Sequence, residues 1–263
     1  MVKCDYVAQG EYVLHNFIEN HHDRLHISAF IIYHDDLIMS IKSWKDIEMK
    51  YTDIIQAVKN DRIDIAVAAA AQLYLTVGIS EAKMTDIAEQ AQIGVASLYR
   101  YFGTKQLFTV KVAAYIWKTT LQEVESLYTG SDYDCLTGLE QVKAFLNVFR
   151  VLMEEHKNFL RFLSEFDMFV VWERLNQEQL KEYETCSLNT MPVVIQAMEK
   201  GKADGTIRPD VDPNLYYHAV TDCLISMCQR FAQGNVPHTE DSERNLQSLN
   251  MTIDMFVAYL QEK

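Results

Sequence analysis

Apolar side chains recur at helical spacing through most of the chain after residue 49. Within residues 60–77 the stripe consists of Ile63, Val67, Ala70, Ala71 and Tyr74. This spacing puts the side chains on one face of a helix, because residues three and four apart lie one above the other. The pattern predicts a helix over 60–77 that ends at Gly78, since glycine is favoured directly after a helix.

Two short helices joined by a tight turn are expected next. Residues 84–91 repeat the helical stripe, and residues 95–102 place Leu98 and Phe102 one turn apart. The turn between them contains Gly94. A helix, a turn with glycine and a second helix, packed on a preceding helix, form a helix-turn-helix unit. The sequence therefore predicts a DNA-reading module in this region.

The remainder of the chain also has a helical pattern. A longer helix is expected from Lys105. Further helices are expected at 137–153, 156–172, 176–201, 213–232 and 240–261. The intervening stretches hold turn-forming Gly, Pro, Asn or Asp, and none of them resembles a β-hairpin. The low counts of 9 Gly and 4 Pro also disfavour a turn-rich β fold, so the predicted fold class is all-α.

The composition is that of a globular protein. Hydrophobic residues make up 49% and charged residues 23% of the 263 residues, which excludes a wholly disordered chain. We expect no transmembrane segment, because no apolar stretch reaches about 18 residues. We also expect no secretory signal, because the N-terminus lacks a basic region followed by an apolar core. Five cysteines form no CxxC pair, and this odd count favours a reducing cytoplasm over a disulfide framework.

The net charge of −13 at first opposes nucleic-acid binding, which requires Lys and Arg. The charge is unevenly distributed, however. Residues 1–48 carry 4 basic and 8 acidic side chains, residues 49–106 carry 6 and 6, and residues 107–263 carry 14 and 23. The predicted helix-turn-helix region is therefore neutral, and a few cations on one of its faces would suffice for DNA.

Residues 1–48 are an extension of unknown role. Their "HHDRLH" run places His22 and His26 four residues apart, but it lacks the acidic partner and third ligand of a zinc motif, so we expect no metal site. Lys45-Asp46 can be encoded by a sequence of the ribosome-binding type just before Met49. Our hypothesis is that Met49 is the true start and that residues 1–48 are translated upstream DNA.

The second helix of the unit, residues 95–102, has an outward face suited to a DNA groove. Arg100 is its one side chain able to bind guanine through two hydrogen bonds. Val95 and Ala96 can offer only apolar contact, for instance to a thymine methyl group, while Ser97 and the tyrosine hydroxyls can donate to phosphates. Packing remains an alternative role for Tyr101, and close approach to a neighbour an alternative for Ser97.

Residues 63–108 resemble the DNA-binding domain of the TetR family of transcriptional regulators. The matching landmarks are the small-residue helix ending in Gly78, "DIAEQA" at 86–91, "GVASLYRYF" at 94–102 and "TK" at 104–105. The segment "ADGTIRPDVDP" at 203–213 also resembles the connection between the seventh and eighth helices of the family. The resemblance implies a homodimer that inserts one helix per subunit into the major groove of double-stranded operator DNA.

The resemblance also implies roles for individual residues. Those expected near bases are Thr85, Val95, Ala96, Ser97 and Arg100. Tyr99 and Tyr101 correspond to aromatic positions that touch backbone or base, and Lys105 corresponds to a phosphate-binding lysine, with a solvated surface charge as its alternative. Lys83 departs from the family pattern, because it replaces the usual Thr or Ser cap of the helix at 84–91 and cannot accept an amide hydrogen bond.

Residues 107–263 correspond to the helical domain that binds a small-molecule effector and dimerises. The dimer interface is expected on the last two helices, at Tyr216, Val220, Leu224, Met227, Ile253, Phe256 and Leu260. The effector pocket is expected at Phe162, Phe166, Phe169, Trp172, Met191 and Ile195. Core packing is the alternative for both sets, and for the last two helices the interface is the favoured interpretation. Acidic Glu165, Asp167 and Asp222 could pair with a cationic effector or form ordinary ion pairs.

The sequence thus predicts three segments: the extension at 1–48, a DNA-binding domain at 49–106 and a ligand-binding and dimerisation domain at 107–263. The expected function is a cytoplasmic, ligand-responsive regulator, most simply a repressor released from its operator by an effector. The alternative is a small-molecule binding protein of the same fold that has lost specific DNA recognition. No catalytic motif and no cofactor motif is present, so we expect no enzyme activity.

Overall fold

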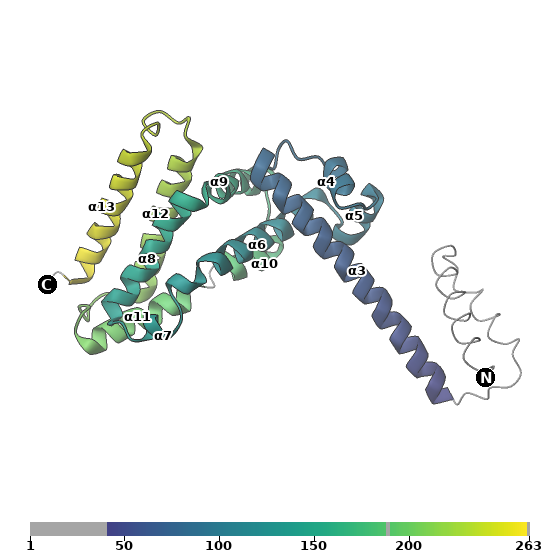
Figure 1. Ribbon diagram of the computed structural model, residues 1–263, viewed down its shortest axis with the longest axis horizontal. Helices are drawn as coiled ribbons and strands as arrows, with labels where there is room; N and C mark the ends of the chain where they lie inside the picture. Colours follow the sequence, from purple (N-terminus) through teal and green to yellow (C-terminus); the bar gives the residue numbers. More distant parts are fainter. Residues whose placement is uncertain (1–40, 188–189, 262–263) are drawn as a thin grey trace, which may run out of the picture. The chain divides into compact units, whose positions relative to one another are not determined.

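A computed structural model describes the backbone of residues 41–187 and 190–261. Two compact units, Met1–Ala57 and Val58–Lys263, make up the chain, and all candidate site residues lie in the second. The described part of the chain consists of helices joined by short connections and contains no β-strand, as the sequence predicted (Figure 1). The histidines of the "HHDRLH" run lie outside the described residues.

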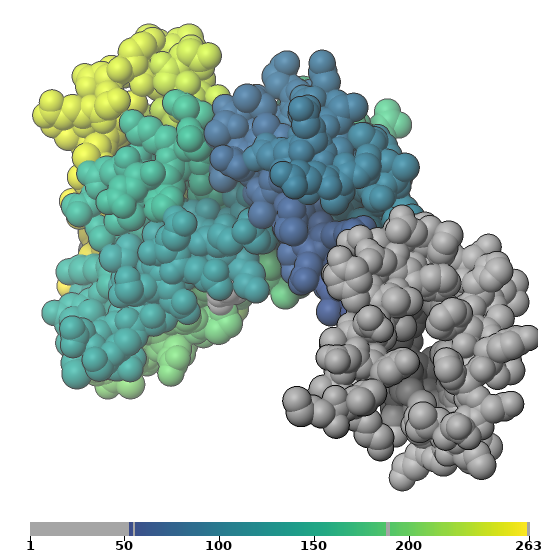
Figure 2. All heavy atoms as spheres, turned by 45° about the vertical axis from the view of Figure 1, so that its right-hand side comes forward, coloured from purple at the N-terminus to yellow at the C-terminus, as the bar shows by residue number. Residues whose placement is uncertain are grey.

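The helix-turn-helix region consists of the helices α3 (Ile41–Val77), α4 (Met84–Gln90) and α5 (Val95–Phe102). The start and end of α5 agree with the sequence, whereas α3 begins well before residue 60 and α4 ends one residue before the predicted Ala91. Figure 2 shows α4, α5 and the adjoining part of α3 as one blue surface, apart from the yellow surface of the last helix.

The described residues after Phe102 form nine further helical segments, one of them a short 3₁₀ turn. They are α6 (Lys105–Val124), the 3₁₀ turn η1 (Glu125–Leu127), α7 (Ser131–Asp134), α8 (Gly138–Glu155), α9 (Lys157–Trp172), α10 (Gln177–Ser187), α11 (Met191–Asp204), α12 (Pro213–Gln233) and α13 (Ser242–Gln261). The prediction of one helix over 176–201 was wrong, because two helices share this segment. Pro192 lies in the first turn of α11, where a proline without an N–H is tolerated, and it could not stand inside a continuous helix.

The predicted stripe on α3 is the base on which the helix-turn-helix packs. Ala66 and Ala70 are fully buried, and Tyr74 retains 2% of its exposure. The Tyr74 hydroxyl shares a hydrogen bond of 3.0 Å with that of Thr109 on α6, and burial raises the pKa of Tyr74 to about 12. Small alanines let neighbouring helices approach α3 closely, while Tyr74 fills the space toward α6 and α9.

A close backbone contact joins α8 to α11. A Cβ atom on Gly138 would lie 2.0 Å from the backbone nitrogen of Gly201, which is shorter than any tolerable contact. The backbone N–H of Gly138 also donates to Asp204 Oδ2 at 2.8 Å, so the end of α11 caps the start of α8. Only glycine fits at position 138, because any Cβ atom there would clash with the backbone of Gly201.

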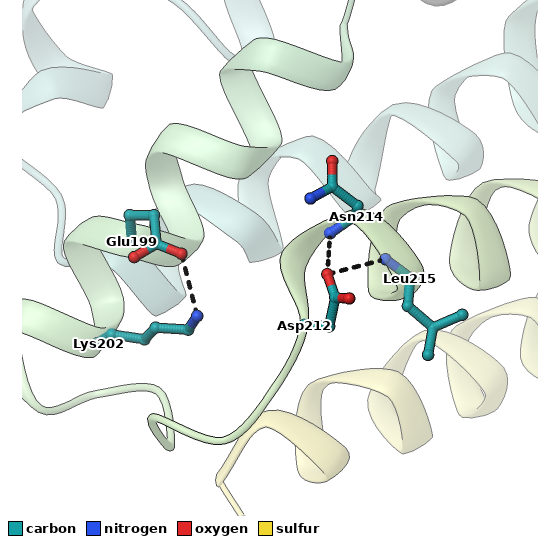
Figure 3. A network of polar contacts seen from close by, with 5 residues as sticks. All are labelled: Glu199, Lys202, Asp212, Asn214 and Leu215. Atoms are coloured by element: carbon teal, nitrogen blue, oxygen red, sulfur yellow. Dashed lines mark hydrogen bonds and ion pairs between the residues drawn. The ribbon is translucent and has the colours of Figure 1, made fainter.

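The connection between α11 and α12 coincides with the segment "ADGTIRPDVDP". Asp212 caps α12 by accepting hydrogen bonds from the backbone N–H groups of Asn214 at 2.9 Å and Leu215 at 3.3 Å (Figure 3). Glu199 and Lys202 form an ion pair of 3.0 Å on the neighbouring α11. The N-cap aspartate followed by Pro213 fixes where α12 starts.

We expect Gly138→Ala to lower the free energy of unfolding by about 2 kcal/mol or more, because the added methyl group must push α8 away from α11. The measurement is urea unfolding followed by circular dichroism at a fixed protein concentration. Lys143→Ala, on the exposed side of α8, serves as the control and should change stability by less than about 0.5 kcal/mol. Equal stability of both variants would contradict the close contact.

Candidate nucleic-acid interface

The turn between α4 and α5 is fixed by backbone hydrogen bonds. The N–H of Ile93 donates to the carbonyl of Ala88 at 2.9 Å, and the N–H of Ser97 donates to Gly94 at 2.8 Å. Gln92 adopts a positive φ of 54°, which lets the chain reverse before Gly94 starts the approach to α5. These hydrogen bonds hold the two helices in one fixed arrangement. A unit that fits into a DNA groove needs such an arrangement.

One side of α5 is anchored in the core. Leu98 is fully buried, and the ring of Phe102 lies 4.4 Å from that of Phe108 on α6. The opposite side faces solvent, with Ala96, Tyr99 and Arg100 exposed and Val95, Ser97 and Tyr101 half-buried. The structure therefore brings together the predicted α5 residues on one accessible face.

Arg100 lies along this face rather than away from it. Its Nη2 donates to Ser97 Oγ at 3.3 Å and to the Tyr101 hydroxyl at 3.5 Å, and its guanidinium carbon is 5.2 Å from the centre of the Tyr101 ring. The hydrogen bond from Arg100 lowers the pKa of Tyr101. The guanidinium is thus oriented in advance on the helix surface, where hydrogen-bond partners on DNA could replace Ser97.

A hollow of about 350 Å³ adjoins the same face. It is bounded by Ser97 and Tyr101 of α5, by the turn at 91–94 and by Arg62 and Ile65 of α3. Arg62 is a cation that the sequence did not single out, because it lies on a different helix, one position before the apolar stripe. Its proximity to Tyr101, whose pKa it also helps to lower, adds a second guanidinium beside α5.

Lys105 has partners within the protein. Its Nζ donates to the carbonyl oxygens of Ala82 at 3.3 Å and Ile79 at 3.5 Å, in the turn that follows α3. Next to it, the Thr104 side chain caps α6 by accepting from the N–H of Leu107 at 3.2 Å. An ammonium group has three donors, so Lys105 can hold this turn and still offer a proton to a phosphate.

The start of α4 lacks a side-chain cap. Lys83 occupies the N-cap position with φ −90° and ψ 148°, and its side chain makes no capping hydrogen bond, as expected from the sequence. Thr85 is exposed and its hydroxyl donates to Asp86 Oδ1 at 3.0 Å. Both residues border the helix-turn-helix face, where they leave the α4 amide groups unprotected by a local acceptor.

The residues proposed for the effector pocket do not all converge. Phe162 and Phe166 are buried in α9 and stack with centroids 6.0 Å apart, and Phe169 lies 6.3 Å beyond Phe166. Trp172 is 70% exposed at the end of the same helix. Met191 and Ile195 are half-buried on α11, which packs against α8 and α12.

A different aromatic cluster lies between α6, α9 and α10. Trp117 lies 5.2 Å from Phe159 and 6.0 Å from Tyr183, and Tyr183 lies 4.6 Å from Phe166, as measured between ring centres. The buried Nε1 of Trp117 has no hydrogen-bond partner. The sequence could not reveal this cluster, because its members come from three separate helices.

The residues proposed for the dimer interface lie mainly inside the single chain. Tyr216, Val220, Leu224 and Leu260 are buried, whereas Met227, Ile253 and Phe256 are half-buried. The solvent-facing side of α12 and α13 carries other apolar residues: Leu215, Met251, Met255 and Tyr259, each 48–69% exposed. The helical period identified an apolar face on these helices, but the neighbouring helices of the same chain already cover it.

The described residues, 41–187 and 190–261, lack two kinds of feature. None of the helices there has both the length and the apolar character needed to cross a membrane. Nor does that part of the chain group three or more His, Cys, Asp or Glu side chains at a metal-binding distance.

Comparison with known proteins gives a family match. Residues 66–108, which comprise the last third of α3, all of α4 and α5 and the start of α6, match the profile of bacterial regulatory proteins of the tetR family. The resemblance noted from the sequence is therefore confirmed by an independent match over the helix-turn-helix.

Longer similarities extend through the helical domain. The HTH-type transcriptional repressor KstR2 of Mycolicibacterium smegmatis is 25% identical over 169 residues, which is 61% of this chain and 75% of that protein. A TetR transcription regulator from Haloarcula marismortui has a similar fold, with a TM-score of 0.58 and 14% identity over 77% of this chain and 100% of that one. The regulator FadR of Bacillus subtilis, solved with stearoyl-CoA, has a TM-score of 0.52 and 14% identity over 74% of this chain and 97% of its own.

Because α4 has no cap, Lys83→Ser should raise the free energy of unfolding by about 1 kcal/mol, since serine can accept from the exposed amides of the first turn. The measurement is the shift in the urea midpoint. Thr104→Ala, which removes the cap of α6, is the matched control and should shift the midpoint the opposite way. A Lys83→Ser variant less stable than the parent would show that the lysine side chain itself supports α4.

Proposed function

This chain carries the DNA-binding domain of the TetR family of bacterial regulatory proteins and folds like members of that family, and from this premise we propose that it is a transcriptional repressor that a small-molecule effector releases from its operator. The observation that carries the proposal is the face of α5. That helix is anchored by Leu98 and presents Arg100, Ser97 and Tyr99 to solvent.

The proposed DNA contacts follow from the chemistry of this face. A major groove admits one helix, and α5 carries Ala96, Tyr99 and Arg100 on its exposed side. Arg100 reads guanine through two hydrogen bonds, and Val95 and Ala96 make apolar contacts to bases. Thr85 and the tyrosines Tyr99 and Tyr101 lie within the same footprint. Arg62, Lys83 and Lys105 supply the charge that phosphates require.

The small number of these cations explains why a dimer is needed. The helix-turn-helix region is neutral overall, so one subunit neutralises few phosphates and gains little non-specific affinity. Two recognition helices on one rigid dimer read two half-sites together, which multiplies their effect. We therefore propose a homodimer in the cytoplasm, with DNA-binding residues within 49–106 and dimerisation and effector binding within 107–263.

We propose the exposed side of α13 as the centre of the dimer interface. Met251, Met255 and Tyr259 follow one another at intervals of four residues and form one apolar stripe on α13, and Leu215 of α12 is also exposed. The buried Tyr216 of α12 stacks on Tyr259 with ring centres 6.4 Å apart, so α12 packs directly against the helix that carries this stripe. An exposed apolar stripe of this kind is costly in water unless a partner covers it.

We propose that the effector is predominantly apolar and enters between α6, α9 and α10. Trp117, Tyr183 and Phe166 provide flat apolar surfaces, and the unpartnered Trp117 N–H can donate to one acceptor atom on the ligand. The stearoyl-CoA bound by the FadR structure of similar fold is an example of a ligand with an apolar part. Phe162 belongs to the same buried stack on α9.

The competing proposal is a binding protein of this fold without DNA recognition. The acidic charge of the chain favours it, whereas the ordered Arg100 on an exposed α5 opposes it. We assign no catalytic role to any residue. The two proposals differ in one observable, which is specific binding to a duplex at low salt.

We expect Arg100→Ala to weaken binding to the cognate duplex by about 1–3 kcal/mol and to relax base preference, because it removes the one bidentate base contact. Lys105→Ala should weaken binding to every duplex and flatten the salt dependence. The measurement is fluorescence anisotropy on labelled duplexes that tile the upstream region of the gene, over a salt series. Lys143→Ala on α8 is the charge-matched control.

Unchanged duplex preference in the Arg100→Ala variant would contradict base reading by α5. Absence of any specific duplex at low salt, both among the tiles and among genomic fragments, would favour the binding protein without DNA recognition.

We expect Met255→Glu to convert the dimer into monomers, because dimerisation would bury an unpaired carboxylate against an apolar partner surface. The measurement is the molar mass by size-exclusion chromatography with light scattering across a dilution series. Gln196→Glu, on the exposed side of α11, adds the same charge elsewhere and should leave the mass unchanged. A Met255→Glu variant that stays dimeric at every dilution would place the interface on another surface.

A further inference from the structure

A single carboxylate of the helical domain holds the turn that leads into the helix-turn-helix. Glu165 of α9 accepts a hydrogen bond from the backbone N–H of Ile79 at 2.8 Å. Ile79 is the second residue after α3 and retains 3% of its exposure. The contact therefore joins α9 directly to the end of the helix on which α4 and α5 are packed.

The turn is shaped to admit this carboxylate. Gly78 has a φ of +90°, and a Cβ atom there would lie 2.6 Å and 2.8 Å from the two carboxylate oxygens of Glu165. Any residue with a side chain would displace the carboxylate and strain the backbone. Glycine at this position thus serves two purposes, since it ends α3 and leaves room for a side chain from α9.

The first residue of α6 contacts the same turn. Lys105 donates to the carbonyls of Ile79 and Ala82, as described above. One turn earlier on α3, Tyr74 stacks on Phe162 with a centroid distance of 6.3 Å and an interplanar angle of 14°. Phe162 and Glu165 are three residues apart on α9, so they form one docking face for the end of α3.

The negative charge of Glu165 does not by itself stabilise α3. A carboxylate at the C-terminal end of a helix meets the negative end of the helix dipole, where cations are favoured. Its favourable contribution comes from the hydrogen bond to Ile79, which is directional. A directional bond at this junction stabilises the contact and also fixes the direction in which the turn leaves α9.

The helix α9 is also tied to α12. Arg161 Nε donates to the carbonyl of Ala232 at 2.7 Å, and Asp167 accepts from Gln229 Nε2 at 2.8 Å. Phe166, which lies between Glu165 and Asp167, belongs to the aromatic cluster around Trp117 and Tyr183. A displacement of Phe166 would therefore move the groups that hold both α12 and the turn after α3.

We propose that Glu165 is a positioning residue for DNA binding. It holds the turn at 78–82 on α9 and thereby sets the direction in which each subunit presents α5, so that the two recognition helices keep the spacing of the two half-sites. The inference rests on the proposed function and deepens it by naming the contact through which α9 controls DNA affinity.

The test uses the full chain with Glu165→Ala, Glu165→Gln and, as a control, Glu155→Ala, which removes an exposed carboxylate at the end of α8. Binding of each protein is measured on the complete operator and on a duplex with a single half-site. Hydrogen exchange of the Ile79 amide is measured in the protein without DNA. Circular dichroism verifies that each variant is folded.

We expect Glu165→Ala to weaken binding to the complete operator about tenfold, the change typical of losing a hydrogen bond to a charged group, and to leave the single half-site within about twofold. Ile79 should exchange about tenfold faster in this variant. Glu165→Gln keeps an acceptor oxygen and should behave like the parent in all three measurements, as should Glu155→Ala.

Equal weakening on both duplexes, unchanged operator affinity, unchanged exchange at Ile79 or a Gln variant as weak as the Ala variant would each overturn the proposal. The exchange measurement needs no DNA. If the parent protein binds no duplex specifically, the proposed function fails, while exchange at Ile79 still decides whether Glu165 holds the turn.

Discussion

The burial of the second half of α3 is the interaction on which the rest of the structure depends. Its alanines at 66 and 70 admit the neighbouring helices closely, and Tyr74 reaches both Thr109 on α6 and Phe162 on α9. The same helix thus supports the recognition helix α5 and contacts the helical domain. A movement of α9 can therefore reach α5 through the end of α3 and the turn that follows it, and also through α6, which contacts Phe159 of α9 and Phe102 of α5.

Because of the charge pattern, the proposed DNA binding depends more on where a few side chains lie than on a general attraction to phosphates. A chain with net charge −13 and a neutral helix-turn-helix region cannot rely on non-specific attraction to phosphates. In the proposed function, specificity comes from a few well-placed groups, of which Arg100 is already oriented by Ser97 and Tyr101 in the protein without DNA. This charge pattern is consistent with the proposed dimer, whose affinity for DNA depends on two recognition helices held at a fixed spacing. A small change of that spacing would release such a dimer from DNA.

Much of the fold could be read from the sequence, because helical periodicity and turn residues act locally. The α5 helix with Leu98 inward, the end of α3 at Gly78 and the uncapped start of α4 at Lys83 all follow from neighbouring residues. The break between α10 and α11 was missed because an apolar pattern continues across it and a single Pro192 decides it. Helical periodicity also cannot say which neighbour covers an apolar face. It therefore predicts an interface at Tyr216 and Val220, which the chain itself buries. Contacts between distant segments, such as that of Glu165 with Ile79 or of Arg62 with Tyr101, leave no local signal.

The most direct test of the account is a selection of genomic DNA fragments bound by the purified protein, followed by sequencing of the enriched fragments. The account predicts one enriched motif with two-fold symmetry, whose half-sites lie about one helical turn or a multiple of it apart, as two α5 helices on one dimer require. Enrichment of no motif, or of fragments that share only base composition, would contradict specific DNA recognition by this chain.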